Sequence, residues 1–340
     1  IILGDNMDLE KREEITELVK IYVPDFSSYS DEQKENLFSD VFDSLEKYKF
    51  NKYSEYFKYE FQNKTETQRQ TFCGSKEYYD WCYNSVENHE SINLSKNKYL
   101  TYLKAKEFYK RDIIKVESFE DYTEFVRFVN KNKVYIIKPI FGSLGRNVSK
   151  ITVSENDSIK SLFFQALQYG GCICEEWIKQ DEQMAQFNPT SVNTIRVVTF
   201  FDNDKLYDVY AMFRTGRNNC PVDNASQGGI AAGINMENGV VFSDGYTKKN
   251  EHFICHPDSH LVYKGFQIPK WPEVLHMIEG LYTKFSDFKI IGWDLALSKD
   301  GWVLVEINNK PNIDTIQMIY NRTYGYGLRS VLEKTIGRYK

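Results

Sequence analysis

The spacing of apolar residues along the chain changes near residue 95. Before it, segments such as "EKREEITELVKIY" and "DEQKENLFSDVFDSLEKYKF" carry apolar side chains at helical intervals on a charged, aromatic-rich background. This periodicity predicts helices, so we expect 1–95 to form a helical N-terminal region. The helical pattern continues through "NKYLTYLKAKEFYKR", and Ser118 is placed to cap a further helix through "FEDYTEFVRFVNK".

Strand patterns dominate from residue 133 onwards. "KVYIIKPI" is rich in β-branched and aromatic residues, and a second strand "VSKITV" follows the turn-prone "FGSLGRN". A helix "SIKSLFFQALQYGG" ends in two glycines and leads to the strands "GCICEEWI", "TIRVVTFF" and "KLYDVYAMFR". Further strands flank the turn "ENG", Pro272 begins a helix, and "KIIGWDLAL" and "GWVLVEINNKP" follow. Because helices and strands mix without βαβ alternation, we expect the α+β class with largely antiparallel sheets.

The last two strands place oxygen-bearing side chains on one face. With a three-residue hairpin loop at 299–301, counting back pairs Asp294 with Glu306. Asn308 shares the face of Glu306, because side chains two positions apart lie on the same side of a strand. Directly opposed carboxylates destabilise a sheet unless a cation or a protonation shift compensates. Two carboxylates and an amide suit Mg²⁺; the competing interpretation is a solvated face at the sheet edge.

A lysine and a glycine-containing loop are candidates for phosphate binding. Lys138 ends a predicted strand, and Gly142, Ser143 and Gly145 lie in the loop that follows. Backbone N–H groups of such a loop can approach phosphate oxygens, and a lysine supplies a point charge. The loop leads to a strand and no GK[ST] follows, so it is neither a P-loop nor a Rossmann fingerprint. Taken alone, "GSLG" fits an ordinary hairpin turn better.

Composition excludes several classes of protein. A chain of 340 residues with 41% hydrophobic content can bury sizeable cores in two or three lobes. The net charge of -5 and the absence of a long basic block argue against nucleic acid as a partner. We find no run near the roughly 20 apolar residues of a membrane span and no signal-peptide pattern, and expect a cytoplasmic protein. The six cysteines form no CxxC pair, and Cys172 and Cys174 are expected to be small buried hydrophobes.

Five motifs resemble the ATP-grasp superfamily in type and order: "NKYLTYLKA", "IIKPIFGSLGRNV", "CICEEWI", "NTIRVVTF" and "DLAL…VEIN". The segments "NPTSVNTIRVVT", "GGIAAGI" and "HPDSHLVYKGFQIPKW" are similar to the sugar-transfer-associated branch. The resemblance covers about residues 95 to 340 and implies two α+β lobes that sandwich a nucleotide, here preceded by the helical region. The expected boundaries are 1–95 for the helical region, 96–180 for the N-terminal lid lobe and 181–340 for the C-terminal lobe.

The resemblance also implies roles in ATP binding. Lys98 and Lys138 are expected to contact the phosphates or the adenine edge, and the loop with Gly142, Ser143 and Gly145 to close over the triphosphate. Four residues are expected to bracket the adenine and reach the ribose: Glu175, Glu176 and Ile178 in the hinge, and Glu182 after it. By the same resemblance, two Mg²⁺ ions are held by Asp294, Glu306 and Asn308.

Two arginines are candidates for catalysis. Arg196 stands in an apolar strand, where an unpaired charge is costly, so a phosphate or carboxylate partner is expected. Arg214, at a strand end, is a weaker candidate that fits a surface position equally well. D-alanine:D-alanine ligases have an arginine two positions before the metal aspartate, whereas this chain has Gly292 there. Arg196 or Arg214 is therefore expected to neutralise the charge that develops in the reaction.

The implied activity is ATP-dependent carboxylate–amine ligation. A carboxylate attacks the γ-phosphoryl group of ATP to give an acyl phosphate, and an amine then displaces phosphate. The expected substrates are a small-molecule, amino-acid or sugar-linked carboxylate and an amine, in bacterial surface-polysaccharide or capsule biosynthesis. Two alternatives stay open: a kinase that phosphorylates a hydroxyl group, and a non-catalytic nucleotide-binding protein. The identity of the substrates and the oligomeric state are not predicted.

Overall fold

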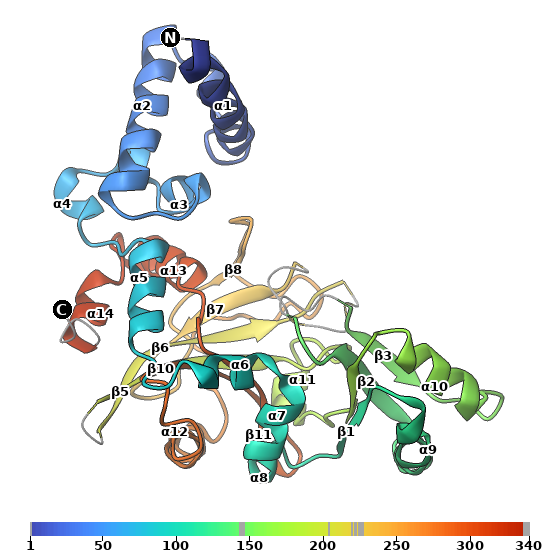
Figure 1. The fold of residues 1–340 in the computed structure, drawn as a ribbon. Coiled ribbons are helices and arrows are strands. Elements are labelled where there is room, and N and C mark those ends of the chain that lie inside the picture. Colours follow the sequence, from blue (N-terminus) through green and yellow to red (C-terminus); the bar gives the residue numbers. More distant parts are fainter. Residues whose placement is uncertain are drawn as a thin grey trace. The chain divides into compact units, whose positions relative to one another are not determined.

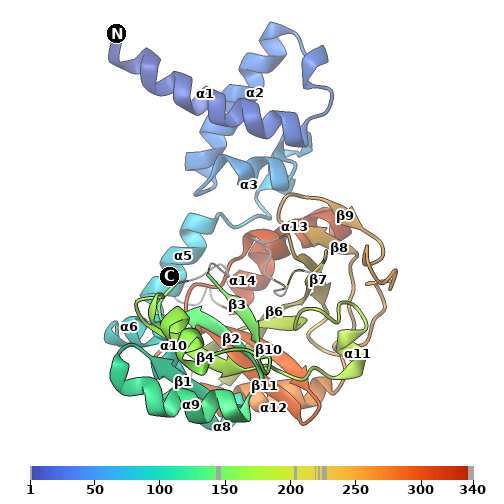
Figure 2. The same ribbon diagram turned by 90° about the vertical axis from the view of Figure 1, so that its right-hand side faces the viewer.

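The computed structural model describes residues 2–142, 147–202, 205–218, 220, 223 and 228–335. The chain divides into two compact units, one formed by Ile1–Asn84 with Asn312–Lys340 and the other by Ser85–Pro311. Figures 1 and 2 show both units as ribbons. The lobe boundaries expected from the sequence stay a prediction.

The first unit is helical, as the sequence predicts for its N-terminal part; the helices of its C-terminal part were not predicted. Its core is aromatic, and the rings of Tyr59, Phe61 and Phe72 lie 5.0–6.3 Å apart between centroids. Gln317 joins the two parts of the unit, because its amide both donates to the carbonyl of Cys73 and accepts from the Cys73 N–H. The helices are α1 (Ile2–Tyr22), α2 (Asp31–Lys47), α3 (Tyr53–Lys58), α4 (Glu66–Arg69), α5 (Ser75–Asn84), α13 (Asp314–Tyr324) and α14 (Arg329–Thr335), with 3-10 turns Phe26–Ser28 and Phe61–Asn63.

The second unit contains a four-stranded antiparallel sheet in the order β1-β4-β2-β3. Its strands are β1 (Ile113–Val116), β2 (Val134–Pro139), β3 (Ser149–Thr152) and β4 (Cys172–Glu176). Helices α9 (Tyr122–Lys131) and α10 (Ile159–Leu167) lie beside this sheet in both views (Figures 1 and 2). Phe125 and Phe163 pack from these helices against Cys172 and Cys174. Both cysteines are buried, as the alternating pattern predicts.

A seven-stranded antiparallel sheet of the same unit has the order β11-β10-β5-β6-β7-β8-β9. Pro272 lies in the first turn of α12, as expected, and α12 packs against the apolar face of this sheet through Val274 and Ile278. The strands are β5 (Thr194–Asp202), β6 (Lys205–Thr215), β7 (Ile230–Ile234), β8 (Gly245–Thr247), β9 (His252–Phe253), β10 (Ile290–Ser298) and β11 (Gly301–Asn308). The remaining helices are α6 (Glu90–Lys96), α7 (Lys98–Lys104), α8 (Lys106–Tyr109), α11 (Glu182–Ala185) and α12 (Trp271–Tyr282).

The β10–β11 hairpin confirms the predicted pairing of Asp294 with Glu306, but by a different route. Ser298 pairs with Gly301, so the loop has two residues and the expected three-residue loop is wrong. Gly301 has a φ of 106°, a conformation that favours glycine. The register then shifts between Leu295 and Asp294, which leaves one extra residue on β11 as a β-bulge. The shorter loop and the bulge cancel, so the two carboxylates still face each other.

Two further differences concern short elements. The strand β1, with the sequence "IIKV", was not expected, because four residues between charged neighbours give a weak strand pattern. After the "ENG" turn the expected strand reduces to two isolated bridges, Ile234 with Val241 and Val240 with Gln267. Ser118 does form the predicted capping box with Asp121, through a 3-10 turn that precedes α9.

Gly239 offers a test of the packing of α12. Its φ is +73°, and a Cβ would lie 2.4 Å from Cγ of Trp271. We expect Gly239→Ala to lower the free energy of unfolding by roughly 2 to 4 kcal/mol, through backbone strain and overpacking. Gly170→Ala is the matched control, since φ is +68° but no atom lies within 4 Å of the new Cβ. A urea titration that gives both variants the same loss, about 1 kcal/mol, would refute the steric argument.

Candidate active site

The polar face of the large sheet is organised around Asp294, whose side chain is only 5% exposed. Register places Arg196 of β5 beside Asp294 on β10. Arg196 donates from Nε to Oδ1 and from Nη2 to Oδ2 of Asp294, both at 2.7 Å. Nη2 of Arg214, from β6, lies 3.0 Å from the same Oδ2. The expected carboxylate partner of Arg196 is therefore present, and Arg214 is a buried member of the cluster.

This clustering sets the charge of Asp294. Burial alone would raise its pKa, but the guanidinium groups of Arg196 and Arg214 outweigh burial and hold the pKa below its ordinary value. Burial likewise opposes the charge of Arg196, and Asp294 reverses the effect, so the pKa of Arg196 is raised. Asp294 and Arg196 are both ionised at neutral pH.

Two residues that the sequence analysis missed hold Arg214. Thr194 Oγ1 accepts from Nε and Nη2 of Arg214 at 3.0 and 2.7 Å. The hydroxyl of Thr194 in turn donates to Asp223, whose Oδ2 lies 3.7 Å from Nε of Arg214. Burial raises the pKa of Asp223 despite the nearby Arg214. Thr194 and Asp223 give no signal in the sequence. They come close to Arg214 only when β5 pairs with β6.

Glu306 and Asn308 lie at the more open side of Asp294. The Glu306 side chain is 37% exposed, and its nearest cation is the Lys98 ammonium, at 3.8 Å from Oε1. Lys98, the first residue of α7, also donates to the carbonyl of Gly142 at 2.6 Å. Nδ2 of Asn308 is buried and has no hydrogen-bond partner among the described residues. Lys98 therefore lies between the start of the glycine-containing loop and the carboxylate hairpin.

A second charged cluster lies in the four-stranded sheet. The ammonium of Lys138 pairs with Oε1 of Glu175, which lies diagonally across from it on β4. Oε2 of Glu175 accepts from Nε and Nη2 of Arg111 at 3.2 and 2.8 Å. Burial would raise the pKa of Glu175, but Lys138 and Arg111 lower it below its ordinary value. Arg111 was missed, because "KRD" in a charged stretch is typical of a surface segment.

The hinge after β4 borders a small cavity of about 120 Å³. Its walls include Glu176 and Ile178 from the hinge, and Ser298 and Val303 from the β10–β11 hairpin. Glu176 accepts from the backbone N–H of Asp112, whereas the backbone of Ile178 has no hydrogen bond within the described part of the chain. The free donor and acceptor of Ile178 are suited to a planar base edge.

One of the expected binding residues that the structure describes is not joined to these clusters. Glu182 begins α11 and is exposed, and no contact of its side chain bears on the hinge. Ser143 and Gly145 lie outside the described residues, so the expected closure of their loop over a triphosphate stays a prediction.

Comparison with known proteins identifies the family of the chain. The family model described as sugar-transfer associated ATP-grasp matches residues 101–336. The chain belongs to the sugar-transfer associated ATP-grasp family. The expected α+β class and ATP-grasp fold are thereby confirmed. A search of curated proteins found no significant match.

Solved structures give distant similarities. N5-carboxyaminoimidazole synthetase from Staphylococcus aureus, complexed with ADP, is 11% identical, with 78% of this chain and 59% of that chain covered and a TM-score of 0.47. D-alanine-D-alanine ligase from Helicobacter pylori is 16% identical, with coverages of 74% and 61% and a TM-score of 0.43. D-alanyl-alanine synthetase A from Vibrio cholerae is 11% identical, with coverages of 72% and 64% and a TM-score of 0.42. The chain thus spans about three fifths of the length of these structures.

ATP-grasp proteins use Mg²⁺, and the donor set of this member fits that ion. Glu306 has an exposed carboxylate, and Oδ1 of Asp294 accepts one hydrogen bond from the residues that the structure describes, which leaves a lone pair. The buried Asn308 amide lacks a partner at Nδ2, and a turn of the amide by about 180° puts its oxygen there. Within the described residues no group of three or more His, Cys, Asp or Glu side chains could hold a metal. The amide is therefore needed to complete this set.

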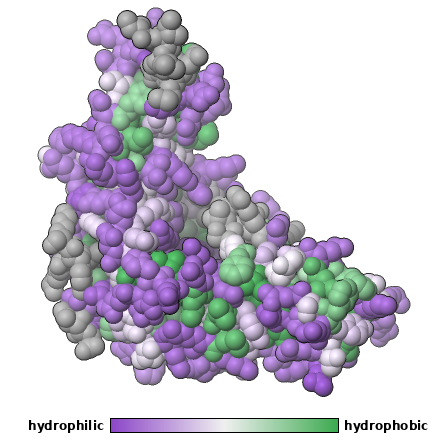
Figure 3. All heavy atoms as spheres, in the orientation of Figure 1, coloured by the Kyte–Doolittle hydropathy of each residue, from purple (hydrophilic) through white to green (hydrophobic). Residues whose placement is uncertain are grey.

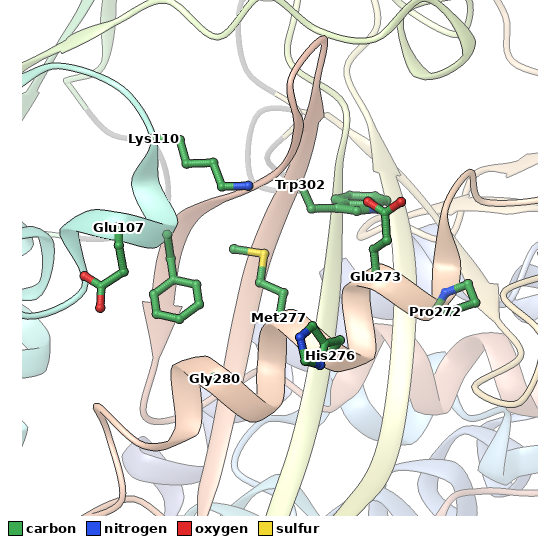
Figure 4. A pocket seen from close by; sticks show the side chains of 9 residues that line it. Glu107, Lys110, Pro272, Glu273, His276, Met277, Gly280 and Trp302 are labelled. Carbon is green, nitrogen blue, oxygen red and sulfur yellow. The ribbon is translucent and has the colours of Figure 1, made fainter.

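A larger cavity, of about 640 Å³, shares only Lys110 with the lining of the hinge cavity. Figure 4 shows its walls, which α8, α12 and β11 supply. The β11 residue Trp302 pairs with Leu297, on the sheet face opposite Asp294 and Glu306. None of the expected site residues lines this cavity, so size alone does not identify the site.

The described helices include none that is both long and apolar enough to cross a membrane. The molecular face drawn in Figure 3 is largely hydrophilic, in keeping with 27% charged residues. Two exposed apolar side chains, Phe119 and Phe164, stand beside each other next to α9 and on α10.

Asp294→Asn tests the arginine cluster. The variant removes the carboxylate partner of Arg196 and leaves Arg214 with Asp223 alone, so we expect a loss of about 3–5 kcal/mol in the free energy of unfolding at pH 7. Because the folded pKa of Asp294 is lowered, its contribution is present above the ordinary value near 3.8 and is lost as pH falls through the folded pKa. The loss should therefore be equal at pH 5 and pH 7, and shrink below about pH 4.

The measurement is urea unfolding of wild type and variant across this pH range. Asp300→Asn, at an exposed position in the loop of the same hairpin, is the control and should leave stability unchanged. A loss under about 1 kcal/mol for Asp294→Asn, the size expected of an exposed ion pair, would contradict the cluster's role.

Proposed function

We propose that the chain is an ATP-dependent carboxylate–amine ligase that acts through an acyl phosphate. The observation that carries the proposal is the grouping of Asp294, Glu306 and Asn308 with two buried arginines on one sheet face. The same unit supplies a second cationic cluster at Lys138 and an open hinge backbone at Ile178. A nucleotide that lies between the hinge and the hairpin would place its base and its phosphates at these two ends.

Nucleotide binding is assigned to the four-stranded sheet, the hinge and α7. Ile178 would meet the base edge through its unpaired backbone groups. Lys98 would meet the phosphates, since it donates to Gly142 at the start of the predicted loop, and Lys138 would do so with the donors that Glu175 does not use. Burial lowers the pKa of Lys98, and the nearby Glu306 partly offsets this effect. Glu182 and the loop residues Ser143 and Gly145 keep their proposed roles at the ribose and the triphosphate.

Charge stabilisation is assigned to the large sheet. Bound Mg²⁺, held by Glu306, Asn308 and Asp294, would neutralise charge on the phosphate oxygens. Arg196 and Arg214 both contact Asp294, and the second carboxylate of the cluster, Asp223, lies farther away, 3.7 Å from Arg214, with a pKa that burial raises. The surplus positive charge favours a carboxylate substrate and the spread charge of a transferring phosphoryl group. No described cysteine, serine or histidine is required as a nucleophile in this scheme.

The substrate class is the finer part of the proposal. The family is described as sugar-transfer associated, which supports a sugar-linked or amino-acid carboxylate in surface-polysaccharide biosynthesis. The use of ATP supports a cytoplasmic reaction. The amine is left open, because the residues that would bind it belong to no cluster described above.

Product analysis distinguishes a ligase from a kinase on the same fold. The full-length chain is incubated with MgATP and a panel of uronic acids and amino acids, with and without candidate amines. A ligase releases ADP and free phosphate only when both carboxylate and amine are present, and the product mass shows an amide. A phosphorylated hydroxyl product without free phosphate would overturn the proposal in favour of a kinase, and ATP binding without turnover would favour a binding protein.

Glu306→Gln tests the metal ligand. The variant keeps shape but removes one charge, so nucleotide binding through Lys138 and the hinge should persist while turnover falls about a thousandfold. The assay follows ADP formation against Mg²⁺ concentration. Glu273→Gln, an exposed carboxylate on α12 at the opposite face, is the matched control and should retain activity. A fully active Glu306→Gln variant with a raised melting temperature would show that Glu306 is only a repelled surface carboxylate.

A further inference from the structure

Arg111 is a buried arginine at the junction of the two sheets of the second unit. Its side chain is only 4% exposed. Besides Glu175, it donates from Nη1 to the carbonyl of Leu304 on β11 at 2.6 Å and to the carbonyl of Tyr109 at 3.1 Å. Its guanidinium carbon lies 5.0 Å from the centroid of the Tyr109 ring. Four of its five N–H groups are thus engaged in fixed bonds, so Arg111 has little freedom to turn toward a ligand.

Lys138, unlike Arg111, has N–H donors that its described contacts do not use. Within the described part of the chain its ammonium pairs only with Glu175, although it carries three N–H donors. Glu175 is a buried carboxylate, 6% exposed, and would hold a single buried lysine strongly if no other cation were near. Arg111 shares that carboxylate on its second oxygen. One negative charge is therefore divided between two cations, and the cluster carries one surplus positive charge.

We propose that Arg111 is a positioning residue that neutralises Glu175 and thereby leaves the charge of Lys138 available to a phosphate group of a bound nucleotide. The inference rests on the proposed nucleotide site. Arg111 also borders the hinge cavity, but its effect on the phosphates acts through Glu175. Without Arg111, Lys138 and Glu175 would form a neutral ion pair. A phosphate would then have to compete with the Glu175 carboxylate for Lys138, and binding of the phosphates would weaken.

The experiment compares a charged and an uncharged ligand. Calorimetry measures binding of MgATP and of adenosine to the full chain, for wild type, Arg111→Met and Arg111→Met with Glu175→Gln. For Arg111→Met we expect MgATP binding to weaken about tenfold, since one charge at the phosphates is lost. Adenosine, which has no phosphate, should bind within about twofold of wild type. The double variant removes the competing carboxylate as well, so MgATP binding should recover.

Arg329→Met is the matched control. Arg329 makes the same kind of contacts in the other unit, with the Glu77 carboxylate and the carbonyl of Phe72. It should lower the melting temperature without a change in MgATP affinity. Arg111→Lys keeps a cation at Glu175 and replaces Arg111→Met in the experiment if that variant does not fold. Arg111→Lys should bind MgATP with an affinity within about threefold of wild type, and its affinity for adenosine should be unchanged.

Three results would overturn the inference. The first is wild-type MgATP affinity in Arg111→Met. The second is an equal loss of affinity for MgATP and for adenosine in Arg111→Met that the double variant does not restore. This pattern would mean that Arg111 only stabilises the structure of the hinge. The third is a large loss of MgATP binding in Arg111→Lys. If the wild-type chain binds MgATP and Arg111→Met binds it equally well, this inference fails alone; if the wild-type chain binds no MgATP, the proposed function fails with it.

Discussion

The buried contact between Asp294 and the two arginines Arg196 and Arg214 constrains the large sheet more than any other interaction described here. Each arginine comes from a different strand, and both meet a carboxylate that is almost inaccessible to water. Leaving any of these charges unpaired in that position would cost several kcal/mol. A slip of one residue between β10 and β5 would turn Asp294 to the apolar face and Trp293 to the polar face. The cluster therefore selects the register that also presents Glu306 and Asn308 to the site.

The same charge pattern occurs in both sheets of the second unit. In each case one buried carboxylate lies between two cationic groups: Glu175 between Lys138 and Arg111, and Asp294 between Arg196 and Arg214. Each of these groups of three leaves a surplus of one positive charge, although the chain as a whole carries -5. Fixed charges in a partly enclosed region act over a longer range than the same charges in water. A chain of acidic composition can thus keep two local sites that favour a polyanion.

The local sequence pattern correctly predicted those features of the structure that depend only on neighbouring residues. The cap at Ser118, the helix after Pro272 and the buried pair of cysteines each depend on a few neighbouring residues, and all are confirmed. The opposition of Asp294 and Glu306 was also predicted, but only because a short loop and a bulge compensate each other. Arg111 and Asp223 were missed for one physical reason. Their burial depends on strands that are far apart in sequence, and no periodicity reports such a contact.

The carboxylates that face each other across the β10–β11 hairpin need no metal to coexist. Asp294 is neutralised by its arginines, so its repulsion of Glu306 is small even before any ion binds. Glu306 keeps an exposed carboxylate, with Lys98 as its nearest cation. Stability therefore depends on Asp294, the inner carboxylate, whereas Glu306, the outer carboxylate, supplies the open ligand position. Folding and metal binding are separable for this reason. That separation would let a metal ion bind and leave without loss of the sheet.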